Sequence, residues 1–112
     1  MKQVALIVAG GSGTRMKTKT PKQFLLLGGI PVLMHTLKQF ASFNQIILVL
    51  PKKEIENWRF LCEQFKFNLK HTVVIGGLSR FSSVNKGLKM ITENSIVAIH
   101  DGVRPLISKK LI

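Results

Sequence analysis

Glycines gather near the N-terminus, directly after an apolar run, and basic side chains follow them. The glycines are Gly10, Gly11 and Gly13, and two of the cations that follow are Arg15 and Lys22. Glycines let backbone N–H groups approach phosphate oxygens closely and form an anion-binding concavity. Cations here would neutralise a triphosphate and the charge that develops during phosphoryl transfer. The segment predicts a nucleotide-phosphate site; the alternative is a glycine-rich turn flanked by solvated lysines.

Two common glycine motifs do not fit this loop. No Gly-Lys-Ser/Thr follows the glycines, so the loop is not the phosphate-binding loop of the P-loop nucleotide hydrolases. Met16 stands where a dinucleotide-binding fingerprint requires its third glycine. The loop therefore indicates phosphate binding of another kind.

Two later loops are also polar or rich in glycine. Gly76 and Gly77 follow an apolar run, and Asp101 and Gly102 follow another. Ligands of open parallel sheets bind outside the carboxyl ends of the strands, so we expect these loops to converge with the first. Asp101 could hold Mg²⁺ that bridges phosphate oxygens, because Mg²⁺ prefers one or two carboxylates plus phosphates. The alternative is a loop-capping carboxylate paired with Arg104.

Strand-like and helix-like patterns alternate between these loops. Apolar runs typical of strands lie at residues 2–9, 45–50, 71–75 and 95–100, and the first two are typical of buried strands in a parallel sheet. Helices are expected after Pro31, after Pro51 and after Ser82 or Ser83 as the capping residue, with a further first turn at 109–112. This order predicts a Rossmann-like, three-layer α/β/α fold with a mainly parallel sheet.

Length and composition favour one soluble domain that is cut short. The chain has 112 residues, and it stops where a helix begins in the predicted pattern. No apolar run approaches the ~20 residues of a membrane helix, and glycines interrupt the first one before a signal-peptide cleavage site. The single cysteine, Cys62, excludes an internal disulfide and is expected in the core. We expect a cytoplasmic protein with no membrane partner.

The net charge of +12 favours polyanionic partners such as nucleotides or nucleic acids. Lysines occur in every segment, so a general lysine bias explains the charge equally well. A nucleic-acid-binding module is a rival of another class, but its aromatic residues would be interleaved with Arg and Lys. Here the aromatic residues lie on apolar stripes, so we expect no nucleic-acid partner.

Five stretches together resemble the 2-C-methyl-D-erythritol 4-phosphate cytidylyltransferase family, within the polyol phosphate cytidylyltransferases. They are residues 9–16 (AGGSGTRM), 21–25 (PKQFL), 31–40 (PVLMHTLKQF), 76–84 (GGLSRFSSV) and 100–105 (HDGVRP). The ribitol 5-phosphate cytidylyltransferases share most of these motifs and are the nearest rival. The resemblance implies a nucleotidyltransferase fold, of which residues 1–112 would be the N-terminal, nucleotide-binding part of a single domain.

The resemblance also implies roles for individual residues. The CTP site would be lined by Ala9, Gly10, Gly11, Gly13, Gly77, Ser83 and Gly102, with Gly77 and Ser83 at the cytosine. Arg15 and Lys22 would be catalytic, since they would bind the triphosphate and stabilise the transition state. Asp101 would bind Mg²⁺, and the motif arginines Arg80 and Arg104 would support the site. A phosphate oxygen of the polyol phosphate would attack the α-phosphorus of CTP, and pyrophosphate would leave.

The resemblance further implies what lies outside these residues. In the family, the C-terminal half supplies the polyol phosphate site and the arm of a homodimer. The chain is therefore expected to retain a nucleotide site but not the acceptor site. An inactive fragment is the remaining alternative.

Overall fold

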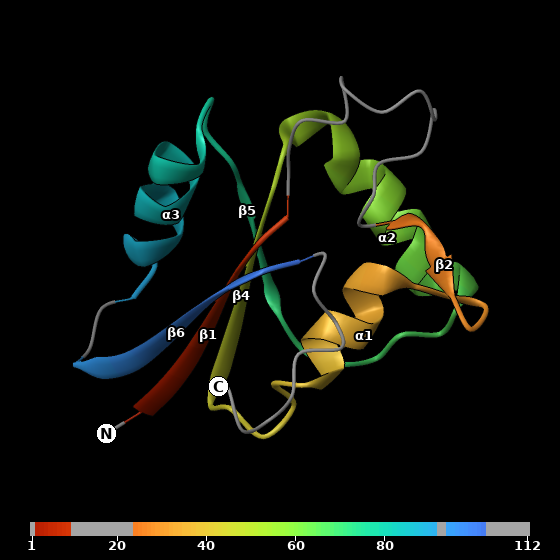
Figure 1. The fold of residues 1–112 in the computed structure, drawn as a ribbon, viewed down its shortest axis with the longest axis horizontal. Coiled ribbons are helices and arrows are strands. Elements are labelled where there is room, and N and C mark those ends of the chain that lie inside the picture. Colours follow the sequence, from red (N-terminus) through yellow and green to blue (C-terminus); the bar gives the residue numbers. More distant parts are fainter. Residues whose placement is uncertain (1, 10–23, 92–93, 103–112) are drawn as a thin grey trace.

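A four-stranded parallel sheet forms the centre of the computed structural model, which describes residues 2–9, 24–91 and 94–102 (Figure 1). Its strands, in the spatial order β5-β4-β1-β6, are β5 (Thr72–Ile75), β4 (Gln45–Leu50), β1 (Lys2–Val8) and β6 (Ser95–Asp101). Every pair of neighbours is parallel. The predicted mainly parallel sheet is confirmed, and each strand lies within about one residue of its expected range.

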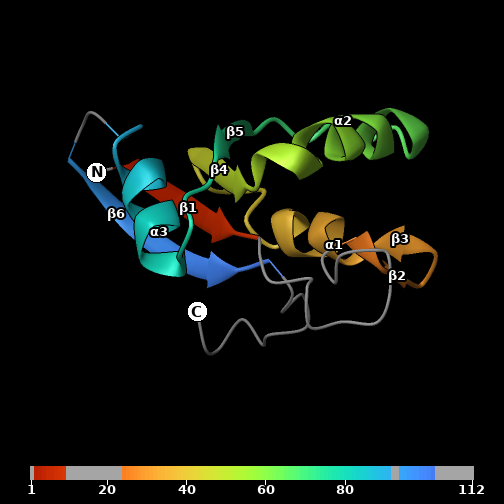
Figure 2. The same ribbon diagram turned by 90° about the horizontal axis from the view of Figure 1, so that it is seen from above.

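Helices cover both faces of this sheet, which gives the expected three layers (Figure 2). One face packs against α1 (Val32–Lys38) and α2 (Ile55–Gln64), which follows a short 3₁₀ turn, η3 (Lys52–Glu54). The opposite face packs against α3 (Arg80–Leu88). No helix among the described residues is long and apolar enough to cross a membrane.

The central strand β1 is buried on both faces because the sheet is covered on both sides. Val4 and Leu6 join the apolar cluster under α3, and Ala5 and Ile7 join the larger cluster under α1 and α2. Successive side chains of a strand point to opposite faces, so a strand between two helical layers must be apolar at every position. This explains the uninterrupted apolar run that predicted it.

A small hairpin before α1 was not predicted. Strand β2 (Leu26–Leu27) pairs antiparallel with β3 (Ile30–Pro31). Gly28 and Gly29 form the turn with φ of +63° and +82°. Two-residue hairpin turns of this kind need positive φ at both central positions, which glycine adopts without strain. The hairpin brings the chain to Pro31, the residue after which α1 begins as expected.

The predicted cap of α3 is wrong in position. The capping residue is Ser79, whose hydroxyl oxygen accepts a hydrogen bond from the backbone N–H of Ser82 at 3.1 Å. The Ser82 hydroxyl oxygen accepts in turn from the backbone N–H of Ser79 at 3.2 Å, which completes a capping box. The helix therefore begins earlier than expected, and Ser83 lies inside it. The helical turn expected at 109–112 lies outside the described residues.

Candidate functional site

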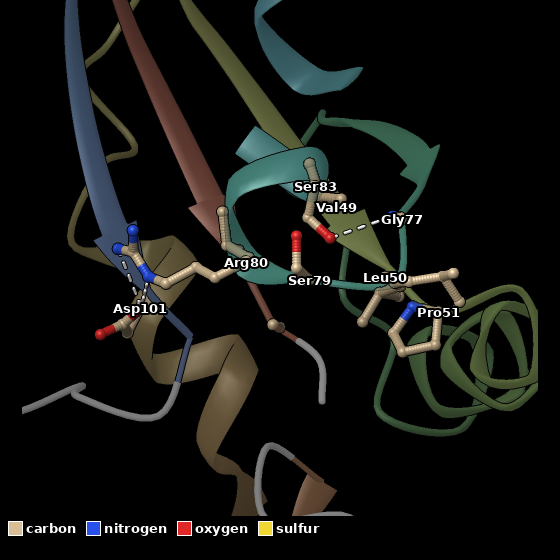
Figure 3. Close-up of a pocket in the computed structure, with 12 residues that line it drawn as sticks. Val49, Leu50, Pro51, Gly77, Ser79, Arg80, Ser83 and Asp101 are labelled. Carbon is tan, nitrogen blue, oxygen red and sulfur yellow. Dashed lines mark hydrogen bonds and ion pairs between the residues drawn. The ribbon is translucent and has the colours of Figure 1, made fainter. Parts of the chain in front are cut away.

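A cavity of about 300 Å³ opens at the carboxyl ends of the parallel strands. Its walls come from the end of β1, the end of β4, the β5–α3 loop with the start of α3, and the end of β6 (Figure 3). The lining residues are Val8, Ala9, Val49, Leu50, Pro51, Gly76, Gly77, Leu78, Ser79, Arg80, Ser83 and Asp101. The position agrees with the general rule that ligands of open α/β sheets bind beyond the carboxyl ends of the strands.

One wall of the cavity is the backbone of the β5–α3 loop, held against α3 by a serine. Ser83 is 7% exposed, and its hydroxyl oxygen accepts a hydrogen bond of 3.0 Å from the backbone N–H of Gly77 (Figure 3). A Cβ atom on Gly77 would lie 2.1 Å from the Ser82 hydroxyl oxygen, so the close approach of loop and helix requires glycine. This wall is therefore fixed before any ligand arrives.

The ends of β1 and β6 pack closely against each other beside the cavity. The backbone N–H of Gly102 donates to the carbonyl oxygen of Val8 at 3.0 Å. A Cβ atom on Gly102 would lie 2.7 Å from Cβ of Ala9 and 3.0 Å from Cδ1 of Leu33. Glycine is thus required at 102 by packing, and it lets the predicted residues Ala9 and Gly102 lie side by side.

Sequence reasoning missed Thr36, which holds the same strand end from the other side. Its side chain is completely buried, and its hydroxyl donates to the carbonyl oxygen of Gly102 at 2.9 Å. The sequence carried one signal for this role. Thr36 is a hydroxyl residue on the apolar face of α1 that carries Leu33 and Leu37, where a buried hydroxyl requires a hydrogen-bond partner.

An ion pair joins two walls of the cavity. The Arg80 guanidinium lies against Oδ1 of Asp101, with Nε at 3.3 Å and Nη2 at 3.2 Å (Figure 3). The side chains are 58% and 34% exposed, respectively. The alternative expectation, a pair between Asp101 and Arg104, involves a residue outside the described part of the chain. Among the described residues, Asp101 pairs with the other motif arginine, Arg80, because α3 starts opposite the end of β6.

Metal-binding capacity at this site rests on one carboxylate. Asp101 is the only acidic residue among the described residues that line the cavity. Within the described ranges there is no group of three or more His, Cys, Asp or Glu side chains that could hold a metal ion. A single carboxylate suits Mg²⁺ when phosphates and water supply the remaining ligands. The residues present therefore fit a cation that is shared with a phosphorylated ligand.

Cys62 takes no part in the site. It lies on α2 and packs against the larger apolar cluster, as expected. Burial raises the pKa of its thiol from 9.0 to about 11. The side chain therefore stays a neutral thiol near neutral pH and is a poor nucleophile.

The structure brings together those predicted site residues that it describes. Ala9, Gly77, Ser83 and Asp101 line the cavity, and Gly102 packs against Ala9. The remaining predicted residues lie outside the described part: Gly10, Gly11, Gly13, Arg15 and Lys22.

Comparison with known protein families shows the family to which the chain belongs. The model of the 2-C-methyl-D-erythritol 4-phosphate cytidylyltransferase family matches residues 3–112. The chain belongs to this family.

Individual members of the 2-C-methyl-D-erythritol 4-phosphate cytidylyltransferase family agree with this assignment. The enzyme of that name from Porphyromonas gingivalis is 53% identical over 112 residues, which is 99% of this chain and 50% of the relative. The crystal structure of 4-diphosphocytidyl-2C-methyl-D-erythritol synthase from Anaerococcus prevotii superposes with a TM-score of 0.76 at 33% identity, over 98% of this chain and 47% of that one. The predicted nucleotidyltransferase fold is therefore confirmed.

A more distant solved structure shares the fold alone. It is a Mycobacterium tuberculosis protein in complex with manganese, with a TM-score of 0.71 and 20% identity over 99% of this chain and 55% of that one. The chain spans about half the length of the cytidylyltransferase family members it matches.

Proposed function

We propose that this chain is the nucleotide-binding part of an enzyme that transfers a cytidylyl group from CTP to 2-C-methyl-D-erythritol 4-phosphate and releases pyrophosphate. The observation that carries the proposal is the cavity at the carboxyl ends of the strands, where Ala9, Gly77, Ser83 and Asp101 meet in a member of this family. The reaction belongs to isoprenoid precursor biosynthesis by the non-mevalonate pathway, and the enzyme is proposed to act in the cytoplasm.

The cytosine is proposed to lie against the loop of Gly76 and Gly77. The Ser83 hydroxyl holds this loop in one position. Fixed backbone donors and acceptors discriminate between bases, because a base with the wrong edge leaves buried polar groups unpaired. Cytosine carries an amino donor where uracil carries a carbonyl acceptor, so a backbone carbonyl in this wall would favour cytosine. Purines would be excluded by size.

The triphosphate is proposed to bind at the glycine-rich loop. The backbone N–H groups of Gly10, Gly11 and Gly13 would contact phosphate oxygens, and Arg15 and Lys22 would neutralise the charge. A phosphate oxygen of the polyol phosphate attacks the α-phosphorus, and the bond to the pyrophosphate oxygen breaks. No covalent enzyme intermediate is needed, since positioning and charge neutralisation carry the rate.

Asp101 is proposed to hold Mg²⁺ together with phosphate oxygens of CTP, with Gly102 next to the ribose. The cation supplies positive charge to the triphosphate. Val8 accepts from the backbone N–H of Gly102 and Thr36 donates to its carbonyl oxygen, so the backbone next to Asp101 is held at the cavity wall. The polyol phosphate site and a homodimer interface are proposed for the remaining half of the full-length protein.

Calorimetric titration of the chain with CTP and Mg²⁺ tests this function, with ATP and UTP as controls. We expect saturable binding that favours CTP and is lost in Arg15→Ala and Lys22→Ala. Matched controls are Arg59→Ala and Lys38→Ala, which remove exposed cations on α2 and α1. Equal binding of UTP or ATP, or no binding by folded protein, would contradict a CTP site in this chain.

A further inference from the structure

The ion pair between Arg80 and Asp101 has a geometry that bears on how a cation enters the site. Both contacts of the guanidinium, at 3.2 and 3.3 Å, go to the same carboxylate oxygen, Oδ1. Both side chains line the cavity, and they reach it from different elements, the start of α3 and the end of β6. The pair is partly exposed to solvent, so it is weak and can exchange for another partner.

The position of Arg80 is not explained by the helix it begins. The partial charge at a helix N-terminus is positive, and it disfavours a cation in the first turn. Arg80 is the first residue of α3, and that turn contains no acidic residue. The capping box of Ser79 and Ser82 fixes the backbone of this turn. The Arg80 side chain therefore leaves the helix from a fixed position. The carboxylate of Asp101 lies against this charge and compensates it.

A divalent cation arriving alone would meet an unfavourable site. Of the described residues that line the cavity, only Asp101 offers a carboxylate. The permanently charged guanidinium lies 3.2 Å from Oδ1 of this carboxylate and would repel a cation bound to the same carboxylate. A cation already bound to a triphosphate differs in two ways. It brings most of its own oxygen ligands, and it brings phosphate oxygens to which a guanidinium can turn.

We propose that Arg80 is a positioning residue that occupies the Asp101 carboxylate in the nucleotide-free site, so that the divalent cation enters only together with the nucleotide. The inference rests on the proposed CTP function. Arg80 acts through Asp101: it keeps the carboxylate at the cavity wall and is exchanged for the metal when the metal–nucleotide complex arrives.

Binding of Mn²⁺ to the 112-residue chain without nucleotide tests this inference, with free Mn²⁺ measured by electron paramagnetic resonance. We expect weak binding by the unaltered chain and about fivefold tighter binding by R80Q, because one repelling charge at short range is removed. R80K keeps the charge and is expected to bind as weakly as the unaltered chain. R59Q is the matched control, since it removes an exposed arginine on α2 and should change nothing.

The double variant R80Q/D101N locates the effect, because it should lose the gain of R80Q. A merely structural role for Arg80 predicts the opposite sign, since a disturbed site would bind Mn²⁺ more weakly or equally. Unchanged or weaker binding by R80Q therefore overturns the proposal. R80M keeps the aliphatic stem without the charge and replaces R80Q if that variant does not fold.

A parallel titration with CTP separates this inference from the proposed function. If R80Q binds Mn²⁺ more tightly but the chain does not bind CTP, Arg80 and the cation do compete for Asp101, but the proposed nucleotide site is rejected. The proposal that the cation enters with the nucleotide is then rejected too. Cation-dependent CTP binding with no change of Mn²⁺ affinity in R80Q would retain the function and reject the role of Arg80.

Discussion

The hydroxyl of Thr36, completely buried in α1, donates a hydrogen bond of 2.9 Å to the carbonyl oxygen of Gly102. This bond ties a helix on one face of the sheet to the end of an adjoining strand. Gly102 directly follows Asp101 in the chain. Helix α1, which does not line the cavity, therefore still helps to set the position of the Asp101 carboxylate.

Replacing Thr36 with valine is expected to lower the free energy of unfolding by about 1–3 kcal/mol, because the Gly102 carbonyl would be left buried without its partner. Valine preserves the shape, so the loss reports the hydrogen bond. Thr36→Ser keeps the hydroxyl and should recover most of the stability. Urea unfolding measures both, and equal stability of the valine variant would contradict the assignment.

Gly102→Ala is expected to destabilise the chain by about 2 kcal/mol or more, because the new methyl group would overlap with Ala9. The clash, 2.7 Å from Cβ of Ala9, involves a short side chain on a strand that cannot yield. Gly87→Ala is the contrast: its methyl would meet Cδ1 of Leu6 at 2.3 Å, an atom that can rotate away. Alanine also favours the helix there by about 1 kcal/mol. Thermal unfolding should therefore rank Gly102→Ala well below Gly87→Ala.

His71 is expected to carry its proton on Nδ1. The indole N–H of Trp58 donates to Nε2 of His71 at 3.0 Å, and an indole nitrogen can only donate. Nε2 is then the acceptor, and Nδ1 donates to the carbonyl oxygen of Leu69 at 2.8 Å. Nitrogen NMR of the ring identifies the tautomer directly. Signals of a ring protonated on Nε2 alone would disprove the arrangement.

We expect the folded chain to lose stability at alkaline pH because of the Cys62 thiol. Burial raises its pKa from 9.0 to about 11 in the folded chain, so the unfolded chain releases this proton more readily. The contribution to stability is fully present below pH 9.0 and is lost as the pH rises towards about 11. Denaturant midpoints compared at pH 8 and 10.5 should fall less in Cys62→Ala. An equal fall in both proteins would assign the change to other groups.

The sheet could be predicted from the sequence because its evidence is local. A strand segment between two helical layers is apolar at every position, and residues 4–8 of β1 and 46–50 of β4 satisfy that rule. The two glycines of the hairpin turn, Gly28 and Gly29, are visible in the sequence. The hairpin was nevertheless not predicted, because its two-residue strands are too short to show periodicity. The cap of α3 was misplaced because three serines compete within five residues, at positions 79, 82 and 83.

The site could be predicted only where its evidence is local in the sequence. Motif residues such as Gly77 and Asp101 could be recognised in the sequence, and they line one cavity. The pairing of Asp101 with Arg80 could not, because those residues are 21 positions apart and meet only through the sheet order. The bond from Thr36 to Gly102 spans 66 positions and is equally invisible to local patterns. The roles of the site residues in binding CTP stay predictions.

The register of β1 against β6 has a consequence for synthesis on the ribosome. Lys2 pairs with Ser95 and Val8 with Asp101, so β1 obtains its second neighbour only after residues 95–101 have been translated. At common elongation rates this takes on the order of ten seconds, during which an apolar strand has an open edge. Parallel pairing over such a distance in sequence also forms slowly. The nascent chain should therefore depend on chaperones until β6 is released, and the cavity cannot exist before that moment.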